Sequence, residues 1–310
     1  MISKSSEHGR SVEYPQPTMY ILAFDVGGSH ISGGLCELGS LNLVSQSSSP
    51  LPNGPGSGSF VECLYRLARE VIGDREKQVV GASLAIPGPF DYAAGVSYMR
   101  HKLRSLYGVD LRAELAQRFG WQRDQFRFLN DAGAFLLGEV HAGVAQGAHR
   151  AIGLTLGTGI GSAFAVCGHL MTDGEGVPPG GEIWNIPYLE GTVEDLLSTR
   201  ALTSSYAGRT GHSAKVIEIA ARVSSDVSAR QVFEAFGLHL GEIVRTILAP
   251  FAPDVVIIGG GISRAADLYL PSARQQFRSA DVHLVASSLF DRAPLIGAAR
   301  FWCGDKNLTP

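Results

Sequence analysis

The sequence predicts an α/β protein of two domains, in which mixed sheets carry helices on their faces. The first observation is an internal repeat: residues 22–35 and 152–165 share the order apolar strand, polar glycine-rich turn, returning strand. Secondly, further apolar strands alternate with segments of helical apolar spacing in both halves. Thirdly, 310 residues with 45% hydrophobic content are enough for two sizeable cores.

Composition excludes several classes of protein. A net charge of -3, from 26 basic and 29 acidic residues, lacks the basic footprint of a nucleic-acid binder. The four cysteines are scattered without CxxC spacing, so we expect neither a disulfide scaffold nor a cysteine zinc site, and a reduced, cytoplasmic setting. No apolar run reaches 18 residues, so no membrane span is expected. Residues 1–18 are polar and are predicted to be a flexible tail, not a secretory signal.

The first half opens with a predicted β-hairpin made of strands 20–24 and 31–37. A third strand is predicted over 41–46, followed by a loop of linker composition, 47–59. The remaining predicted elements are helix 60–71, strand 79–86, helix 110–119 with Asp110 as its N-cap, strand 126–129 and helix 134–141.

The second half repeats this opening with strands 151–156 and 160–167. Predicted helices follow at 193–206, 214–221 and 228–248, then strand 255–258, another helix, strand 282–286 and a final helix, 295–302. The predicted domains are 19–130, completed by the C-terminal helix within 295–310, and 131–294. A ligand is expected in the crevice between them, at strand ends.

Both glycine-rich turns are candidate phosphate sites, because glycine lets backbone N–H groups point at an anion. The first turn contains Gly27, Gly28 and Ser29, and the second contains Gly157, Thr158 and Gly159. An aspartate beside a phosphate needs a cation between them, so Asp25 suggests Mg²⁺, held directly or through water. Each turn taken alone is better explained as a tight hairpin, and the occurrence of two matching turns is what favours a polyphosphate site. The second leads into a strand, which rules against a Rossmann fingerprint or a P-loop.

Three further carboxylates are candidates for chemistry on a sugar. Asn130-Asp131 follows a strand and precedes a helix, so Asp131 is placed either as a general base or as an ordinary N-cap. Glu182 and Glu194 flank a segment without clear periodicity and are either acceptors for sugar hydroxyls or surface acids. His101 and Lys102 have the same two interpretations: pocket-facing or solvated.

Taken together, these motifs resemble the ROK group (repressors, open reading frames and sugar kinases) of the actin-like ATPase superfamily. The resemblance runs over 19–302 and rests on motifs in the family's order. These are Asp25-Val26-Gly27-Gly28-Ser29 with Gly34-Leu35, Ile86-Pro87-Gly88-Pro89, Asn130-Asp131-Ala132 with Gly138-Glu139, Gly157-Thr158-Gly159-Ile160-Gly161, Gly180-Gly181-Glu182-Ile183, 253–262, and Leu295-Ile296-Gly297-Ala298-Ala299.

The resemblance implies the two-domain actin-like (ribonuclease H-like) fold and a role for each matching residue. Asp131 would be the catalytic base, and Gly88, Asn130, Glu182 and Glu194 would contact the sugar. Gly260 and Gly261 would face the nucleotide, beside the two phosphate turns. The family is often dimeric, so a homodimer is the assembly that the resemblance suggests.

The chain departs from the family on the sugar side. Trp184-Asn185 stands where Gly-His is expected, and no cysteine lies between Cys167 and Cys303. Thiolates and imidazole are what hold structural zinc, so we expect none. Asn185 would then replace the histidine as a neutral hydrogen-bonding group, and residues 172–194 form a shortened loop. His30 replaces a common lysine in the first turn.

The function implied is transfer of the γ-phosphoryl group of ATP, with Mg²⁺, to a hexose, first of all to the 6-hydroxyl of glucose. N-acetylmannosamine, fructose or another hexose is the alternative substrate, and polyphosphate the alternative donor. Two other classes are a non-catalytic sugar-binding protein and a sugar-responsive repressor. The repressor is disfavoured, because 18 residues before Met19 are too few for a helix-turn-helix domain.

Overall fold

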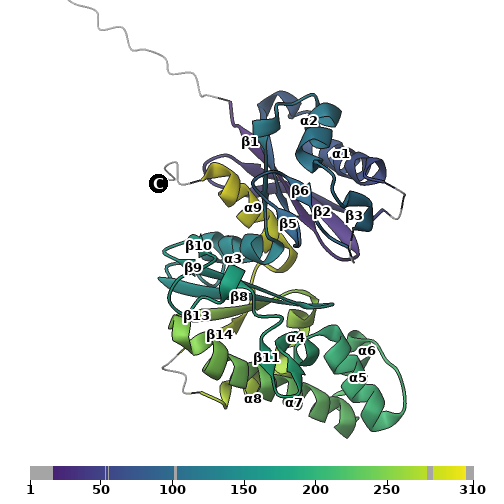
Figure 1. The fold of residues 1–310 in the computed structure, drawn as a ribbon, viewed down its shortest axis with the longest axis vertical. Coiled ribbons are helices and arrows are strands. Elements are labelled where there is room, and N and C mark those ends of the chain that lie inside the picture. The colour runs from purple at the N-terminus through teal and green to yellow at the C-terminus, as the bar shows by residue number, and fades with distance from the viewer. Residues whose placement is uncertain (1–16, 53, 55, 101–102, 278–281, 305–310) are drawn as a thin grey trace, which may run out of the picture.

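The computed structural model describes residues 17–52, 54, 56–100, 103–277 and 282–304. The candidates His101 and Lys102, most of the predicted N-terminal tail and the end of the predicted C-terminal segment lie outside these residues. Figure 1 shows two layered α/β halves, one above the other, with α3 and α9 between their sheets.

The first sheet has the strand order β3-β2-β1-β4-β7, in which β1, β2 and β3 are antiparallel neighbours and β4 and β7 run parallel to β1. Its strands are β1 (Tyr20–Val26), β2 (His30–Glu37), β3 (Leu43–Pro50), β4 (Val79–Ala85) and β7 (Phe126–Leu129). The linker predicted over 47–59 is wrong at its start. Ser47, Ser48 and Ser49 pair with β2, because an edge strand needs only backbone hydrogen bonds and tolerates polar side chains.

The second sheet has the order β10-β9-β8-β13-β14. Its strands are β8 (Arg150–Leu156), β9 (Ile160–Val166), β10 (His169–Met171), β13 (Val255–Gly259) and β14 (His283–Ala286). Here β8 and β9 form an antiparallel hairpin, and β13 runs parallel to β8, as β4 does to β1. This confirms the internal repeat, and mixed sheets with flanking helices confirm the predicted fold class. Two small hairpins, β5 (Phe90–Asp91) with β6 (Val96–Ser97) and β11 (Pro187–Tyr188) with β12 (Gly191–Thr192), were not predicted.

The apolar run of β1 is explained by burial on both faces of the sheet. Leu22 and Phe24 pack with α1 (Gly58–Ile72) and α2 (Leu111–Phe119), whereas Ile21 and Ala23 pack with α9 (Ala293–Cys303). The predicted cap of α2 is confirmed, since Asp110 accepts a hydrogen bond from the Ala113 amide at 2.9 Å. The C-terminal helix thus covers the sheet that the N-terminus begins.

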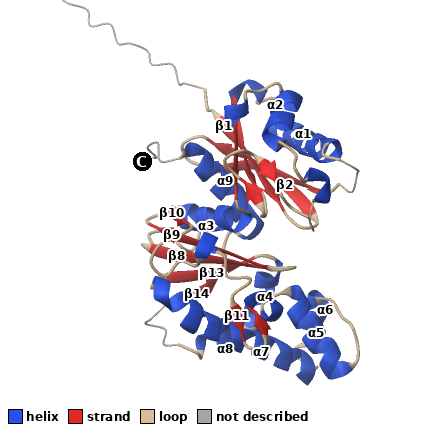
Figure 2. Cartoon of the chain, viewed as in Figure 1, coloured by secondary structure: helices blue, strands red, loops and turns tan. Residues whose placement is uncertain are grey.

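Several helices pack on or beside the second sheet and share its hydrophobic core (Figure 2). They are α4 (Val193–Leu196), α5 (Thr199–Thr210), α6 (Val216–Arg222), α7 (Val227–Ile243) and α8 (Leu270–Arg274). The single helix predicted over 193–206 is two helices, since Ser198 has extended backbone and its hydroxyl caps α5 at the Ala201 amide. The helix predicted over 228–248 is α7, continued by a π-helical turn, Val244–Leu248. Short 3₁₀ segments span Glu76–Gln78, Arg104–Leu106, Arg123–Gln125, Pro179–Gly181, Ala249–Phe251, Gly261–Leu268 and Phe290–Arg292.

Helix α3 (Asp131–Ala142) is shared by both cores. Ala134 and Leu137 pack with residues of the first sheet, while Phe135 and Leu136 pack with residues of the second. The domain limits at 130 and 294 stay a prediction. No helix among the described residues is long and apolar enough to cross a membrane.

Two glycines let α3 and α9 approach backbone to backbone. A Cβ at Gly138 would overlap the carbonyl oxygen of Ala293, and a Cβ at Gly297 would overlap that of Ala134. Neither neighbour is the end of a flexible side chain, so an added methyl group would have to push the helices apart.

We therefore expect Gly297→Ala to destabilise the protein by about 2 kcal/mol or more, because overpacking costs that much in a rigid contact. Thermal unfolding would show it as a lowered Tm. The matched control is Gly208→Ala on the exposed side of α5, where an added Cβ meets nothing within 4 Å. That change should leave Tm unchanged or raise it slightly, because alanine is the better helix former. Equal effects of the two changes would contradict the close approach of the helices.

Candidate active site

The candidate site lies where the parallel strands of the first sheet end. Asp25 is the penultimate residue of β1 and is paired with Ala85, the last residue of β4. Gly88 follows β4, and Asn130 follows β7. Because parallel strands present their carboxyl ends at one edge, the chain brings Asp25, Gly88, Asn130 and Asp131 to the same edge of the sheet.

The start of α3 distinguishes the two interpretations of Asp131. Asn130 is the N-cap, and its Oδ1 accepts a hydrogen bond from the Gly133 amide at 3.1 Å. Asp131 is the first helical residue, and its Oδ1 accepts from the Ala132 amide at 3.0 Å. The interpretation of Asp131 as the N-cap is therefore wrong. Its carboxylate, half-buried, lies at the positive end of the helix dipole, which stabilises negative charge.

Tyr92 is a site residue that the sequence analysis missed. Its hydroxyl donates to the Ile86 carbonyl oxygen at 3.1 Å and accepts from the Asn130 side-chain amide at 3.3 Å. Burial, and then the charges of Asp131 and Glu182, raise the pKa of this phenol, while the hydrogen bond from Asn130 opposes them. Gly88 adjoins it, since a Cβ there would lie 3.6 Å from the Tyr92 hydroxyl. A tyrosine three residues after Pro-Gly-Pro has no distinctive spacing that could have revealed it.

Asp25 lies in the electric field of other carboxylates. Its pKa is raised to about 7, first by burial and then by the negative charges of Asp131 and Asp291. Asp25 and Asp131 are therefore close enough to repel each other. A divalent cation would offset both burial and repulsion, and a carboxylate is the kind of oxygen ligand that Mg²⁺ prefers. Among the described residues, no group of three or more His, Cys, Asp or Glu side chains is arranged to hold a metal ion by itself.

Each glycine turn is closed by a backbone hydrogen bond, and the first turn is one residue longer than the second. In the first, the Gly27 amide donates to the His30 carbonyl oxygen at 3.0 Å, and Gly28 and Ser29 are exposed. The Ser29 hydroxyl lies 3.3 Å from the His30 ring nitrogen. In the second, the Gly157 amide donates to the Gly159 carbonyl oxygen at 2.9 Å, and Thr158 is exposed.

The end of β13 adjoins the second turn. Gly260 has a φ of +77°, and a Cβ there would overlap the backbone of Leu156, the residue before Gly157. Glycine is required at Gly260 on both counts. Gly261 is exposed and opens the following 3₁₀ segment. In that segment Arg264 forms an exposed 2.6 Å ion pair with Asp291, one of the carboxylates whose charge reaches Asp25.

Glu194 contacts the second turn. Its Oε2 accepts from the Ile160 amide at 3.2 Å, and its carboxylate occupies the space that a Cβ at Gly159 would need. The structure thus brings Glu194 to the predicted phosphate turn, and its role as a sugar ligand stays a prediction.

Glu182 is held by the backbone on both of its sides. The Ser162 hydroxyl donates to the Gly181 carbonyl oxygen at 2.6 Å and accepts from the Ile183 amide at 3.1 Å. Glu182 itself is exposed, and its Oε2 accepts from the Trp184 indole nitrogen at 2.9 Å. Asn185 lies in the exposed turn that follows.

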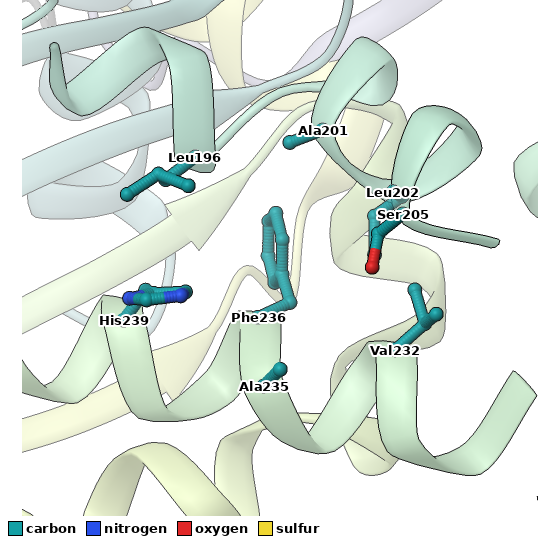
Figure 3. A pocket seen from close by; sticks show the side chains of 8 residues that line it. All are labelled: Leu196, Ala201, Leu202, Ser205, Val232, Ala235, Phe236 and His239. Atoms are coloured by element: carbon teal, nitrogen blue, oxygen red, sulfur yellow. The ribbon is translucent and has the colours of Figure 1, made fainter. Parts of the chain in front are cut away.

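A small cavity of about 70 Å³ lies away from this edge, between α4, α5 and α7 (Figure 3). Its lining includes Leu196, Leu202, Phe236 and the ring of His239, and none of the predicted site residues. It therefore has no part in the site.

Comparison with known proteins shows the family and the fold. The model of the ROK family matches residues 21–304. A glucokinase of Thermotoga maritima is 28% identical over 91% of this chain and 97% of its own length. An N-acetyl-D-glucosamine kinase of Pectobacterium atrosepticum is 26% identical over 79% of this chain and 85% of its own. The solved structure of a ROK family glucokinase from Streptomyces griseus, in complex with glucose and AMPPNP, has a TM-score of 0.76 at 22% identity, covering 91% of this chain and 98% of its own.

The two mixed sheets, each opened by an antiparallel hairpin, and their flanking helices define a two-domain protein with the actin-like ATPase fold. Within that class, the chain belongs to the ROK family, as its motifs predicted.

The raised pKa of Asp25 leads to a prediction about stability. The unfolded chain ionises this carboxyl near pH 3.8, but the folded protein retains the proton until about pH 7. Between these values folding requires Asp25 to take up a proton, and this uptake opposes folding more strongly as pH rises. Asp25→Asn removes this proton uptake. The Tm of the variant minus the Tm of the wild type should therefore increase from pH 4 to 7 and stay constant at higher pH.

The measurement is thermal unfolding from pH 4 to 8 without nucleotide or divalent cation. The control is Asp74→Asn, because Asp74 is exposed in the turn after α1. A wild-type curve parallel to that of Asp25→Asn across this range would contradict the buried, repelled carboxyl.

Proposed function

We propose that the chain is an ATP- and Mg²⁺-dependent sugar kinase that transfers the γ-phosphoryl group to a hexose hydroxyl, first of all the 6-hydroxyl of glucose. The observation that carries the proposal is the position of Asp131. It lies at the positive end of α3, next to a capping Asn130 and in the electric field of Asp25. Phosphoryl transfer needs a carboxylate beside the acceptor hydroxyl and donors for the phosphates, and this edge has candidates for both.

In this proposal, Asp131 accepts the proton of the sugar hydroxyl as that oxygen attacks the γ-phosphorus. Because Asn130 caps α3, Asp131 needs no capping role and its carboxylate keeps a fixed direction. Tyr92 holds the Asn130 amide from the other side. Glu182 and Asn185 are proposed as sugar contacts, together with Gly88, where the absence of a side chain leaves room above Tyr92.

The phosphate side of the proposal uses the two glycine turns, with Gly260 and Gly261 beside the nucleotide. Asp25 would hold Mg²⁺, directly or through water, and the ion would neutralise charge on the phosphates. Since the pKa of Asp25 is about 7, binding of the cation near neutral pH would release a proton from this carboxyl.

The observed position of Glu194 on the second turn opposes phosphate binding there, because a carboxylate repels phosphate. Its hydrogen bond to the Ile160 amide is 3.2 Å long, at the limit of good geometry. We propose that Glu194 leaves this amide when ATP binds and turns to the sugar, which reconciles its observed contact with its role in the family.

Other substrates are distinguished by a panel of acceptors and donors. N-acetylmannosamine and fructose are alternative acceptors, and the N-acetyl-D-glucosamine kinase relative adds a further amino sugar. Polyphosphate is an alternative donor, because it presents similar phosphates to the same turns. A binding protein without catalysis would bind a sugar but transfer no phosphate. The proposal includes a cytoplasmic setting, in which the four free cysteines would stay reduced.

Asp131→Ala is the central test. Removal of a general base costs about 10²- to 10⁴-fold in rate, so we expect kcat to fall by that much while the sugar still binds. The measurement is sugar-dependent ADP release, with binding followed separately by calorimetry. Asp74→Asn serves as the control, because Asp74 is exposed in the turn after α1. Wild-type protein without turnover on any hexose or amino sugar, with either donor, would refute the kinase.

Tyr92→Phe tests the support of Asn130. The change keeps the ring and removes the hydroxyl that joins Asn130 to the Ile86 carbonyl oxygen. A hydrogen bond of this kind is worth about 0.5–1.5 kcal/mol, so kcat/KM for the sugar should fall about 2- to 10-fold with KM for ATP unchanged. Tyr65→Phe on α1, outside this edge, is the control. A change in KM for ATP alone, with kcat/KM for the sugar unchanged, would contradict the role of Tyr92 on the sugar side.

A further inference from the structure

Trp184 stands at the sugar side of the candidate site, where the resemblance leads one to expect glycine. Residues 181–184 alternate between buried and exposed: Gly181 and Ile183 are buried, and Glu182 and Trp184 are exposed. Glu182 has extended backbone, and Trp184 begins the turn that the Ile186 amide closes on the Ile183 carbonyl oxygen. The side chains of Glu182 and Trp184 meet on the exposed side of this segment.

Hydrogen bonds and the burial of Ile183 hold the Glu182–Trp184 pair in place. The Trp184 indole N–H donates to Glu182 Oε2 at 2.9 Å, and the Trp184 carbonyl oxygen accepts from the Glu194 amide at 3.1 Å. Ile183 between them is fully buried, and Ser162 fixes its amide. The segment that carries Glu182 is thus anchored from β9 on one side and from the start of α4 on the other.

The segment that carries the pair is held by β9 next to the start of α3. A Cβ at Gly161 would lie 3.2 Å from the Cβ of Ala132, and the following residue, Ser162, bonds the backbone on both sides of Glu182. The charge of Glu182 acts on the Tyr92 phenol, and the Tyr92 hydroxyl is bonded to Asn130. Trp184, attached to Glu182, keeps 44% of its surface exposed. Because its only polar atom is engaged by Glu182, the exposed surface of the indole ring is apolar.

We propose that Trp184 is a specificity-determining residue of the sugar subsite, on which the apolar C–H face of a hexopyranose ring packs while the indole N–H holds the carboxylate of Glu182 toward the sugar hydroxyls. The inference rests on the proposed function and extends it. A flat apolar ring beside a fixed carboxylate selects a pyranose whose hydroxyls are equatorial, as in glucose, because C–H bonds alone then point at the indole. Fructose presents either a furanose or a pyranose with an axial hydroxyl, so glucose is preferred to it.

The test uses fluorescence, because the chain has three tryptophans in different surroundings. Trp121 packs on Phe119 and Phe126, and Trp302 packs beneath Arg127, so both belong to the first domain's core. Titration of the full chain with glucose, without nucleotide, should change the emission. Trp184→Phe should abolish that change, whereas Trp121→Phe should keep it.

Kinetics supply the second measurement. Trp184→Phe loses the donor to a charged group, so KM for glucose should rise about tenfold with little change in kcat or in KM for ATP. Trp184→Leu, which also loses the ring, should raise it further, and both should narrow the preference for glucose over fructose. Unchanged Tm values in the two variants show that the fold is intact.

The outcomes separate this inference from the proposed function. Wild-type turnover with an unchanged KM for glucose in both variants, or a glucose-induced emission change that survives in Trp184→Phe, would overturn the role of Trp184 and leave the kinase standing. A glucose-induced change that depends on Trp184, in a protein that phosphorylates no sugar, would support the subsite and refute the kinase.

Discussion

The contact between α3 and α9 is the constraint on which the rest of the structure depends. Gly138 and Gly297 remove the side chains at the crossing, so the two helices meet backbone to backbone. One helix follows directly on β7 and the other ends the described chain, yet together they fill the space between the sheets. Widening this contact by one methyl group would move the strand ends of the first sheet away from those of the second. The candidate site draws residues from both.

The same helix pair positions groups on both sides of the site. The N-terminus of α3 carries Asn130 and Asp131, and its far end carries Glu139, which is fully buried. The Glu139 carboxylate accepts hydrogen bonds from the Ser287 hydroxyl and from the Leu289 and Val144 amides. It thereby holds the loop that leads into α9 and carries Asp291, whose charge reaches Asp25. A single helix thus connects the proposed base with the proposed phosphate side.

Much of this arrangement was predictable, because apolar spacing and glycine-rich turns in the local sequence indicate strands and their connections. The buried strands, the repeated hairpin and the final helix followed from apolar spacing, and the ROK resemblance rested on short motifs in order. The break at Ser198 and the pairing of the polar strand β3 were not predictable, since tertiary contacts and backbone pairing decide them. For the site, the motifs indicated Asp131 and its neighbours. Tyr92 was missed because its side-chain partner, Asn130, is 38 residues away in the sequence. The Trp184–Glu182 contact was missed because it depends on the local backbone of a segment without regular secondary structure.

The cover that α9 provides for the first sheet has a consequence for synthesis. Ile21, Ala23 and Leu129 pack against Leu295, Ala298 and Ala299, which are made long after the strands that they cover. Domains commonly fold in order as the chain leaves the ribosome. Here one face of the first sheet stays uncovered until α9 has been translated, after all the strands of the second sheet. The second domain can therefore finish folding before the first, and the nascent chain presents an apolar surface that chaperones would recognise throughout its elongation.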